Sequence, residues 1–129
     1  QRWTWGRFPR ANGGTTCFYD GKRADGSTLA LGLDIAANGK AEVVEPPPLA
    51  PINRTAWGIA RQTRCDTGAN PRQTMPLLDA PFYSRSLVQT QIAGETVTGV
   101  HEALDLARFR SPLVKAMLAV RVPRRAHWP

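Results

Sequence analysis

The sequence predicts an all-β fold, an antiparallel barrel or sandwich that ends in one short helix. Apolar and polar residues alternate through most of the chain, as they do in strands that bury one face. Turn signals containing Asn-Gly or Asp-Gly pairs recur between these stretches, at residues 12–14, 25–26 and 38–39. The helices that a βαβ architecture requires are missing from the pattern, so we expect roughly eight strands joined mostly by hairpins.

Four strands are expected in the first third of the chain, because these stretches alternate or are rich in β-branched and aromatic residues. They cover residues 2–8, 15–20, 27–36 and 40–45. In the third stretch the large apolar side chains share one face: Leu29, Leu31, Leu33 and Ile35. The other face carries small residues and Asp34, and it either leaves room for a ligand inside a barrel or faces solvent.

Three consecutive prolines, Pro46 to Pro48, then interrupt the strand pattern, because proline donates no ladder hydrogen bond and favours an extended backbone. We interpret them as a stiff connection inside one domain that covers residues 1–129, since each flank is small for independent folding. A loop is expected at residues 66–71. Further strands are expected near residues 55–64, 73–78, 81–92 and 96–106.

A short helix is expected after the last strand. Ser111 is a favoured capping residue, and Pro112 then occupies the first helical position, where proline is tolerated. The apolar residues that follow have helical spacing and are expected to form one face up to about Val120: Leu113, Val114, Met117 and Leu118.

Composition favours one globular domain. The chain has 129 residues, of which 42% are hydrophobic, and no apolar run approaches the ~20 residues of a membrane-spanning helix. No secretory signal is visible at the start, and the absence of an initiator Met suggests a piece of a longer protein. Cys17 and Cys65 form no metal motif; they could pair if their strands are neighbours, although reduced thiols in the cytoplasm are the favoured interpretation.

The chain is basic, with 17 Lys and Arg against 10 Asp and Glu and a formal charge of +7. The basic residues are scattered and accompany no recognition motif, which argues against nucleic acid as a partner. Their main cluster runs from Arg121 to Arg125, beside His127 and Trp128. A basic segment with an interfacial Trp is compatible with a membrane surface, and the alternative is a solvated tail.

The sequence offers acids and aromatic residues rather than cofactor motifs. It has no Gly-rich phosphate loop and no metal-ligand spacing, and its two histidines argue against a His-based metal site, so no cofactor or metal is expected. Asp20 follows two aromatic residues; it either has a raised pKa and donates a proton or starts a turn. His101 and Glu102 must point to opposite faces of their strand, and each acts either in catalysis or as a structural hydrogen-bonding group.

Aromatic side chains could supply the apolar part of a site. Such faces stabilise a developing cation or pack along a polyene. The alternative for each of them is ordinary core packing. We expect five of them to line one cavity: Trp3, Trp5, Tyr19, Phe82 and Tyr83.

Segments along essentially the whole chain resemble, in order, the carotenoid 1,2-hydratases, which also act as hydroxyneurosporene synthases. Each segment alone is a weak signal, but jointly they are specific. They are Trp3-Thr4-Trp5, Phe18-Tyr19-Asp20, Asp25-Gly26-Ser27, Glu45 to Pro48, Ala80 to Leu87, Val100 to Leu104, Arg108 to Val114 and Val122 to Arg125.

The resemblance implies a lipocalin-like all-β enzyme without a redox cofactor, which adds water to the terminal carbon–carbon double bond of an acyclic carotenoid. It further implies that this chain is the C-terminal part of a longer two-domain protein. The implied partners are an acyclic carotenoid or other apolar polyene and the upstream β domain. The basic C-terminal tail adds a membrane surface as a candidate partner. We expect the protein in the cytoplasm, and this tail offers a peripheral position at the inner photosynthetic membrane as one option.

Hydration of an alkene requires a protonated acid, surroundings that tolerate a tertiary cation, and a positioned water. We expect Asp20 to be the acid, with Tyr19, Trp3 and Trp5 shaping the cation pocket. His101 and Glu102 are expected to support the site or position the water. The residues alone leave the choice of acid open among Asp20, Asp34 and Glu102. A non-enzymatic carotenoid-binding or lipid-binding module of a membrane complex is the alternative function.

Overall fold

The computed structural model describes residues 1–46, 49–65 and 73–121. Antiparallel strands form most of this part, and a 3₁₀ helix (Leu106–Arg110) and one α-helix follow them. The elements in chain order are β1 (Arg2–Pro9), β2 (Thr15–Lys22), β3 (Thr28–Ile35), β4 (Ala41–Val44), β5 (Leu49–Arg54), β6 (Ala60–Cys65), β7 (Gln73–Asp79), β8 (Tyr83–Ile92), β9 (Glu95–Asp105) and α1 (Pro112–Arg121).

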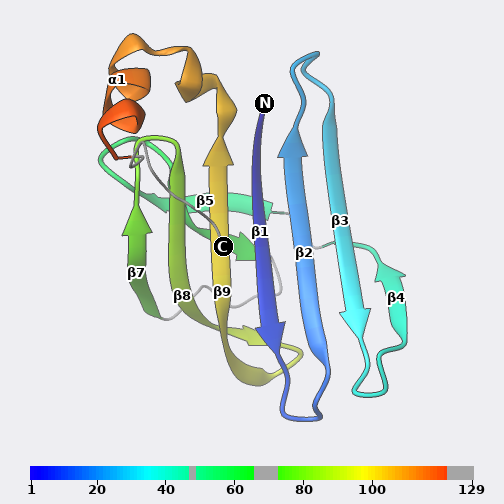
Figure 1. Cartoon of the computed structure of the whole chain (residues 1–129). Helices are drawn as coiled ribbons and strands as arrows, with labels where there is room; N and C mark the ends of the chain where they lie inside the picture. The colour runs from blue at the N-terminus through cyan, green and yellow to red at the C-terminus, as the bar shows by residue number, and fades with distance from the viewer. Residues whose placement is uncertain (47–48, 66–72, 122–129) are drawn as a thin grey trace, which may run out of the picture.

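Seven of these strands form one antiparallel sheet in the order β4-β3-β2-β1-β9-β8-β7, whereas β5 and β6 pair only with each other. The first and last strands of the chain, β1 and β9, are neighbours at the centre of this sheet (Figure 1). Among the described residues β4 and β7 are the edges, and the sheet does not close into a barrel. The prediction of an antiparallel all-β fold with a short C-terminal helix is confirmed.

The two faces of the sheet differ in burial. We call the face that carries Phe8, Phe18 and Val88 the inner face, because these side chains form the buried core together with Val97. The rings of Phe8 and Phe18 stack with their centroids 6.0 Å apart. The β5–β6 hairpin lies over this inner face, where β6 contacts β8 and β9 (Figure 1). The opposite side, which we call the outer face, has no such covering element among the described residues.

A second cluster anchors the hairpin to the sheet. Ile59, just before β6, and Ala60, its first residue, pack on Ala103 of β9, and all three side chains are buried. Burial of one such aliphatic side chain stabilises the fold by roughly 1.5–3 kcal/mol, so this small contact fixes where the hairpin sits.

The predicted strand at residues 55–64 is wrong at its start, because this stretch contains a hairpin turn. The hydroxyl of Thr55 accepts hydrogen bonds from the backbone N–H groups of Trp57 and Ile59, each at 3.2 Å. Gly58 has a φ of 77°, a left-handed conformation that suits glycine. The strand before this turn, β5, was missed because Pro51 lies in it; a proline is tolerated there since β5 has a free edge within the described residues.

The segment that follows β9 also differs from the prediction. A 3₁₀ helix intervenes before α1, and Asp105 caps it by accepting a hydrogen bond from the backbone N–H of Ala107 at 3.0 Å. The helix then begins at Pro112 as predicted, with the Ser111 carbonyl accepting from the N–H of Lys115. The single apolar face is only partly correct: Val114 is buried, but Leu113 is 62% exposed.

Several sequence predictions lie outside the described residues. They are the loop at 66–71, Pro47 and Pro48, and the basic tail beyond Arg121. No helix within the described part of the chain is long and apolar enough to span a membrane. Cys17 is a free thiol on β2, and the side chain of Cys65 is among those not described.

Two glycines permit the close packing of the core beneath β1 and β9. A Cβ atom on Gly99 would lie 2.2 Å from the Arg7 carbonyl oxygen and 2.5 Å from Cδ1 of Phe8. A Cβ on Gly6 would lie 2.4 Å from Cε1 of Phe18. These positions therefore admit no side chain unless the backbone or the core rings move.

We predict that Gly99→Ala lowers the free energy of unfolding by about 1–3 kcal/mol or more, because its methyl group must displace backbone as well as the Phe8 ring. Urea denaturation of the chain followed by tryptophan fluorescence measures this change. Thr98→Ala, on the exposed side of the same strand, serves as the control and should cost far less. Equal stability of Gly99→Ala and the unaltered protein would contradict the packing described here.

Candidate active site

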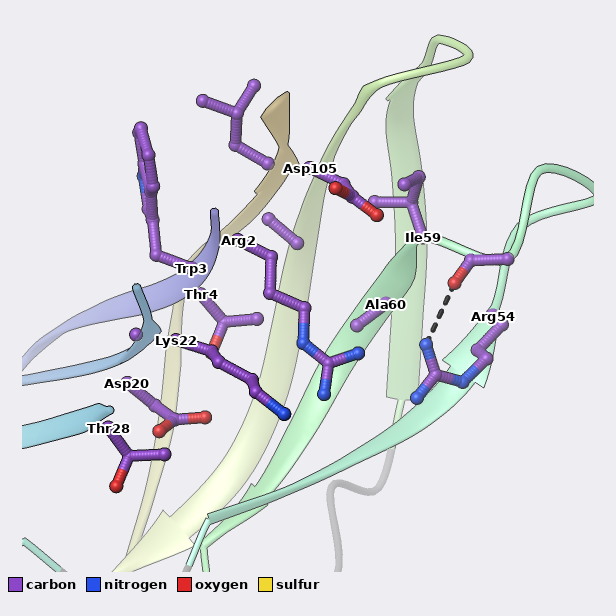
Figure 2. A pocket seen from close by; sticks show the side chains of 14 residues that line it. Arg2, Trp3, Thr4, Asp20, Lys22, Thr28, Arg54, Ile59, Ala60 and Asp105 are labelled. Carbon is purple, nitrogen blue, oxygen red and sulfur yellow. Dashed lines mark hydrogen bonds between the residues drawn. The ribbon is translucent and has the colours of Figure 1, made fainter. Parts of the chain in front are cut away.

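A cavity of about 140 Å³ lies between the inner face of the sheet and the β5–β6 hairpin. The sheet contributes Thr4 from β1, Asp20 from β2 and Ala103 from β9, while the hairpin contributes Ile59 and Ala60. Figure 2 shows the sheet strands on one side of this cavity and the hairpin on the other. The cavity therefore exists because the Thr55 turn places the start of β6 against β9.

Asp20 is one of two acids that line this cavity, the other being Asp105. Asp20 lies within β2, opposite Thr4 of β1 and Ala30 of β3, so the alternative that it starts the turn after β2 is wrong. Burial raises the pKa of the Asp20 carboxyl group above its ordinary value, and the nearby positive charge of Arg2 opposes this shift. The carboxyl group is thus moved toward the protonated form that a proton donor requires.

Charged side chains surround the mouth of the cavity. Arg2, Lys22 and Arg54 are basic, and Asp105 is acidic. The guanidinium of Arg54 donates a hydrogen bond from Nη1 to the Gly58 carbonyl oxygen at 2.8 Å, which ties it to its own hairpin. In Figure 2 the side chains of Arg2 and Lys22 extend into the space between the sheet and the hairpin. The cavity lining therefore combines these charged groups with small apolar groups at Ala60 and Ala103.

The tryptophans gather elsewhere, along an open apolar groove of about 440 Å³. Trp5 lies opposite Tyr19, which in turn lies opposite Leu31, so these side chains share the outer face. Trp3 and Leu33 line the same groove. Because adjacent strand residues alternate, Asp20 points to the face opposite Tyr19. The expectation that these aromatic residues surround Asp20 in one cavity is therefore wrong for Trp5 and Tyr19.

Trp3 links the two regions. It lies at the end of the groove and is also among the residues that line the cavity. In Figure 2 its ring points away from Asp20, so its contribution is to the rim of the cavity. Trp3 is thus the residue shared by the aromatic groove and the cavity that holds the half-buried Asp20.

Tyr83 and Glu102 form a separate polar cluster on the outer face. The Tyr83 hydroxyl donates a hydrogen bond of 2.6 Å to Oε1 of Glu102, and Nε of Arg85 lies 3.2 Å from the same oxygen. Burial, followed by the hydrogen bond to Glu102 and the charge of Glu102, raises the pKa of Tyr83 to about 12. Glu102 is thus engaged as an acceptor of a hydroxyl and a guanidinium, a poor arrangement for a proton donor.

Phe82 is a packing residue in this structure. Its ring lies 4.6 Å, centroid to centroid, from that of Phe109 in the 3₁₀ helix. Phe82 and Tyr83 line neither the cavity nor the aromatic groove, so the single cavity expected for the five aromatic residues does not form in the described part of the chain.

His101 lies on the inner face, on the opposite side of β9 from Glu102, as the alternation predicts. It is 1% exposed, and its ring is tilted against that of Phe18 with the centroids 6.2 Å apart. Burial lowers the pKa of His101 to about 4, while a hydrogen bond with the Arg61 backbone and the charge of Glu102 act in the other direction. The imidazole is therefore neutral near pH 7 and sits in the core outside the cavity lining.

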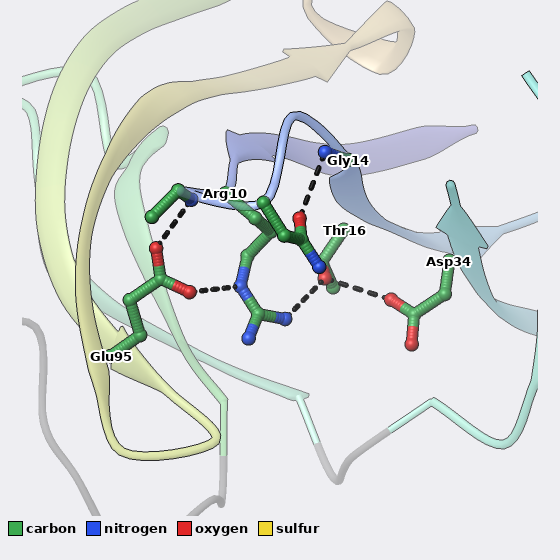
Figure 3. A network of polar contacts seen from close by, with 7 residues as sticks. Arg10, Gly14, Thr16, Asp34 and Glu95 are labelled. Carbon is green, nitrogen blue, oxygen red and sulfur yellow. Dashed lines mark hydrogen bonds and ion pairs between the residues drawn. The ribbon is translucent and has the colours of Figure 1, made fainter. Parts of the chain in front are cut away.

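Asp34 belongs to a surface network at the far end of the sheet. Its Oδ1 accepts a hydrogen bond of 2.8 Å from the Thr16 hydroxyl, which accepts one of 3.3 Å from Arg10. Arg10 also pairs with Glu95 at 2.7 Å, and Figure 3 shows this chain of contacts joining the β1–β2 turn to the β8–β9 turn. Asp34 itself is exposed, whereas Gly32 on the same face of β3 is buried opposite Phe18, so the solvent-facing alternative applies to Asp34 but not to this whole face.

Among the described residues, no three His, Cys, Asp or Glu side chains gather where they could hold a metal ion. Sequence reasoning missed Thr4, Ile59 and Ala60 as cavity residues. Alternation did place Thr4 on the face opposite Trp3 and Trp5, which is the face of Asp20, but nothing local indicated which hairpin would cover it.

The fold and the site together define a lipocalin-like all-β protein with a partly buried acid. In fold it is similar to the crystal structure of an AttH protein from Nitrosomonas europaea, with a TM-score of 0.55 and 19% identity over 80% of this chain and 38% of that one. The chain belongs to the carotenoid hydratase CrtC family, whose family model matches residues 1–129.

Two of its relatives are acyclic carotenoid 1,2-hydratases. The chain is 58% identical over 126 residues to the acyclic carotenoid 1,2-hydratase of Cereibacter sphaeroides, covering 98% of this chain and 45% of that protein. It is 56% identical to the Rhodobacter capsulatus acyclic carotenoid 1,2-hydratase, again over 98% and 45% of the two chains. The chain thus spans less than half the length of these two relatives.

We predict that His101 makes the protein less stable as the pH falls from 7 to 5. The folded state holds His101 with a pKa of about 4 and the unfolded state with one near 6.5, so only the unfolded state gains a proton in this range. The contribution present above pH 6.5 is lost as the pH falls, by about 2 kcal/mol at pH 5.

Urea denaturation at the two pH values measures this loss, and His101→Gln provides the comparison because it cannot titrate. The variant should have lower stability at pH 7 and a smaller difference between the two pH values. An identical pH dependence in both proteins would show that the imidazole is not held neutral by burial.

Proposed function

We propose that this chain forms the C-terminal portion of an acyclic carotenoid 1,2-hydratase, completed by an upstream β domain of the same protein. The similarity to two proteins of that name across 98% of the chain supports this proposal. The substrate would be an acyclic carotenoid, whose terminal double bond gains water. Because such a polyene dissolves in lipid rather than in water, we place the protein in the cytoplasm, peripheral to the inner membrane.

Asp20 is our choice for the proton donor, and its burial in the cavity is the observation that carries this choice. Burial raises the pKa of this carboxyl group. Glu102 is engaged with Tyr83 and Arg85, and Asp34 is exposed in a surface network. Of these three acids Asp20 alone combines a cavity with a shift toward the protonated form.

The reaction then follows from elementary alkene chemistry. The π electrons of the terminal double bond take the proton of the Asp20 carboxyl group, forming a C–H bond at the less substituted carbon and leaving a tertiary cation. The lone pair of a water forms the C–O bond and the water releases a proton, so that alkene and water together give a tertiary alcohol. Aromatic faces stabilise such a cation, and Trp3 is the aromatic residue that lines the cavity, although its ring is directed away from Asp20 (Figure 2).

The outer groove suits the long apolar part of the substrate. Trp5 and Tyr19 offer flat faces beside Leu31 and Leu33, and Trp3 continues this surface to the cavity. Tyr83 and Glu102 would hold the neighbouring strands β8 and β9 together on the same face. His101 would support the inner face as a neutral core residue.

We predict that Asp20→Asn lowers hydration at least about 100-fold, because general acid catalysis contributes on this order. The assay uses a chimera in which this sequence replaces the matching segment of the Cereibacter sphaeroides hydratase, so that the upstream portion is present. Product formation from an acyclic carotenoid is followed by chromatography.

Asp25→Asn is the matched control, since Asp25 lies in the exposed turn of the same hairpin and accepts hydrogen bonds from Ser27. Its activity should stay close to that of the unaltered chimera. Near-normal hydration by Asp20→Asn with loss in Glu102→Gln would transfer the acid role to Glu102. A chimera that binds carotenoid without forming product would favour the non-enzymatic binding module.

A further inference from the structure

A second polar group lies beside Asp20 in the cavity. Thr4 is the direct cross-strand neighbour of Asp20 on β2 and of Ala103 on β9, so its side chain projects into the same space. Its Oγ1 atom is buried, and it has no hydrogen-bond partner among the residues that the structure describes. Figure 2 shows Thr4 and Asp20 together on the sheet side of the cavity.

A buried hydroxyl without a hydrogen-bond partner is energetically unfavourable, which favours the binding of a polar molecule beside it. The cavity that it lines has a volume of about 140 Å³. A water occupies about 30 Å³ in the liquid, so there is room for one beside the end of an alkene.

The spacing of the two side chains fits a shared water. Directly opposed residues in an antiparallel pair have Cβ atoms about 4.5–5.5 Å apart. A water that donates or accepts hydrogen bonds of about 2.8 Å to each side chain spans such a separation. The hydroxyl of Thr4 can both donate and accept, and the carboxyl group of Asp20 offers the second contact.

We propose that Thr4 Oγ1 and the Asp20 carboxyl group together hold the water that attacks the carbocation, an inference that rests on the function proposed above. After Asp20 has given its proton to the alkene, it is a carboxylate. The water forms the new C–O bond while its proton passes to Thr4 Oγ1, and the Thr4 hydroxyl proton passes to the Asp20 carboxylate. The alcohol leaves, and both side chains regain their starting protonation states.

This role makes Thr4 a positioning residue for the second half of the reaction only. Proton transfer to the alkene needs Asp20 but not Thr4. A cation that meets no positioned water can return a proton to the Asp20 carboxylate and regenerate the alkene. In deuterated water that return leaves deuterium in the recovered substrate, so the two halves of the reaction can be measured separately.

The experiment compares Thr4→Val, which keeps the shape of the side chain but removes the hydroxyl, with the unaltered chimera in deuterated water. Mass spectrometry of the recovered carotenoid reports proton transfer, and chromatography reports hydration. We expect Thr4→Val to lower hydration about 10- to 100-fold, because the attacking water is no longer correctly positioned. Deuterium incorporation should stay within about twofold of that in the unaltered chimera. Thr4→Ser should restore hydration, because it returns the hydroxyl.

Ser86→Ala is the matched control. The Ser86 hydroxyl is also buried on the inner face and has no partner among the described residues, but it does not line the cavity. Removing it should leave both measurements unchanged. Thermal unfolding of each variant shows whether it folds, and Thr4→Ala repeats the test if the valine variant does not.

The role of Thr4 and the choice of Asp20 as the acid would be contradicted by different results. Hydration within twofold of normal in Thr4→Val, or an equal loss of hydration and deuterium incorporation, would overturn the role of Thr4 and leave that of Asp20 standing. Normal hydration and deuterium incorporation in Asp20→Asn would overturn the choice of acid, and the role of Thr4 with it. A folded, unaltered chimera without either reaction would overturn the proposed function itself.

Discussion

The pairing of β1 with β9 is the interaction on which the rest of the structure depends. It joins two halves of a sheet, β4-β3-β2-β1 and β9-β8-β7, whose side chains also meet in the core of Phe8, Phe18, Val88 and Val97. The register from Arg2 opposite Asp105 to Arg7 opposite Val100 fixes which side chains of the two halves meet. Because a slip of one residue would exchange the two faces, this single register decides the composition of both.

The consequence for the site is direct. The register places Ala103 beside Thr4, and Thr4 beside Asp20, so one row of side chains crosses three strands on the inner face. Ala103 also packs against Ile59 and Ala60 of the hairpin. The strand pairing therefore brings together the sheet side of the cavity and also provides the residue against which the β5–β6 hairpin packs. At the other end of β1, the Arg10–Glu95 ion pair joins the two turns and helps to hold the same register.

Alternation along strands was the part of the fold and of the candidate site that the sequence could predict well. It separated His101 from Glu102 correctly, and it located the strands on either side of the Asn-Gly and Asp-Gly turns. The same rule applied to Tyr19 and Asp20 separates them as well, and the expectation of one shared pocket overlooked this. The sequence could not predict two tertiary features: the register between β1 and β9, and the position of the β5–β6 hairpin on the sheet. Both depend on contacts between residues far apart in the chain. The Thr55 turn was also missed, because Thr55 is β-branched and therefore suggested a strand.

The β5–β6 hairpin lies over the inner face. Burial there shifts the pKa values of one acid and one base in opposite directions. Removing a charged form from water is unfavourable for acids and bases alike, so burial raises the pKa of Asp20 and lowers that of His101. Each group is moved toward its neutral form. A neutral carboxylic acid is what protonation of an alkene requires, whereas the neutral imidazole of His101 lies in the core outside the cavity lining. On the outer face burial also raises the pKa of Tyr83, whose hydroxyl donates a hydrogen bond to Glu102. The inner cavity and the outer groove therefore differ in their side chains, with a carboxyl group on one face and aromatic and aliphatic groups on the other, because successive strand residues alternate between the two faces.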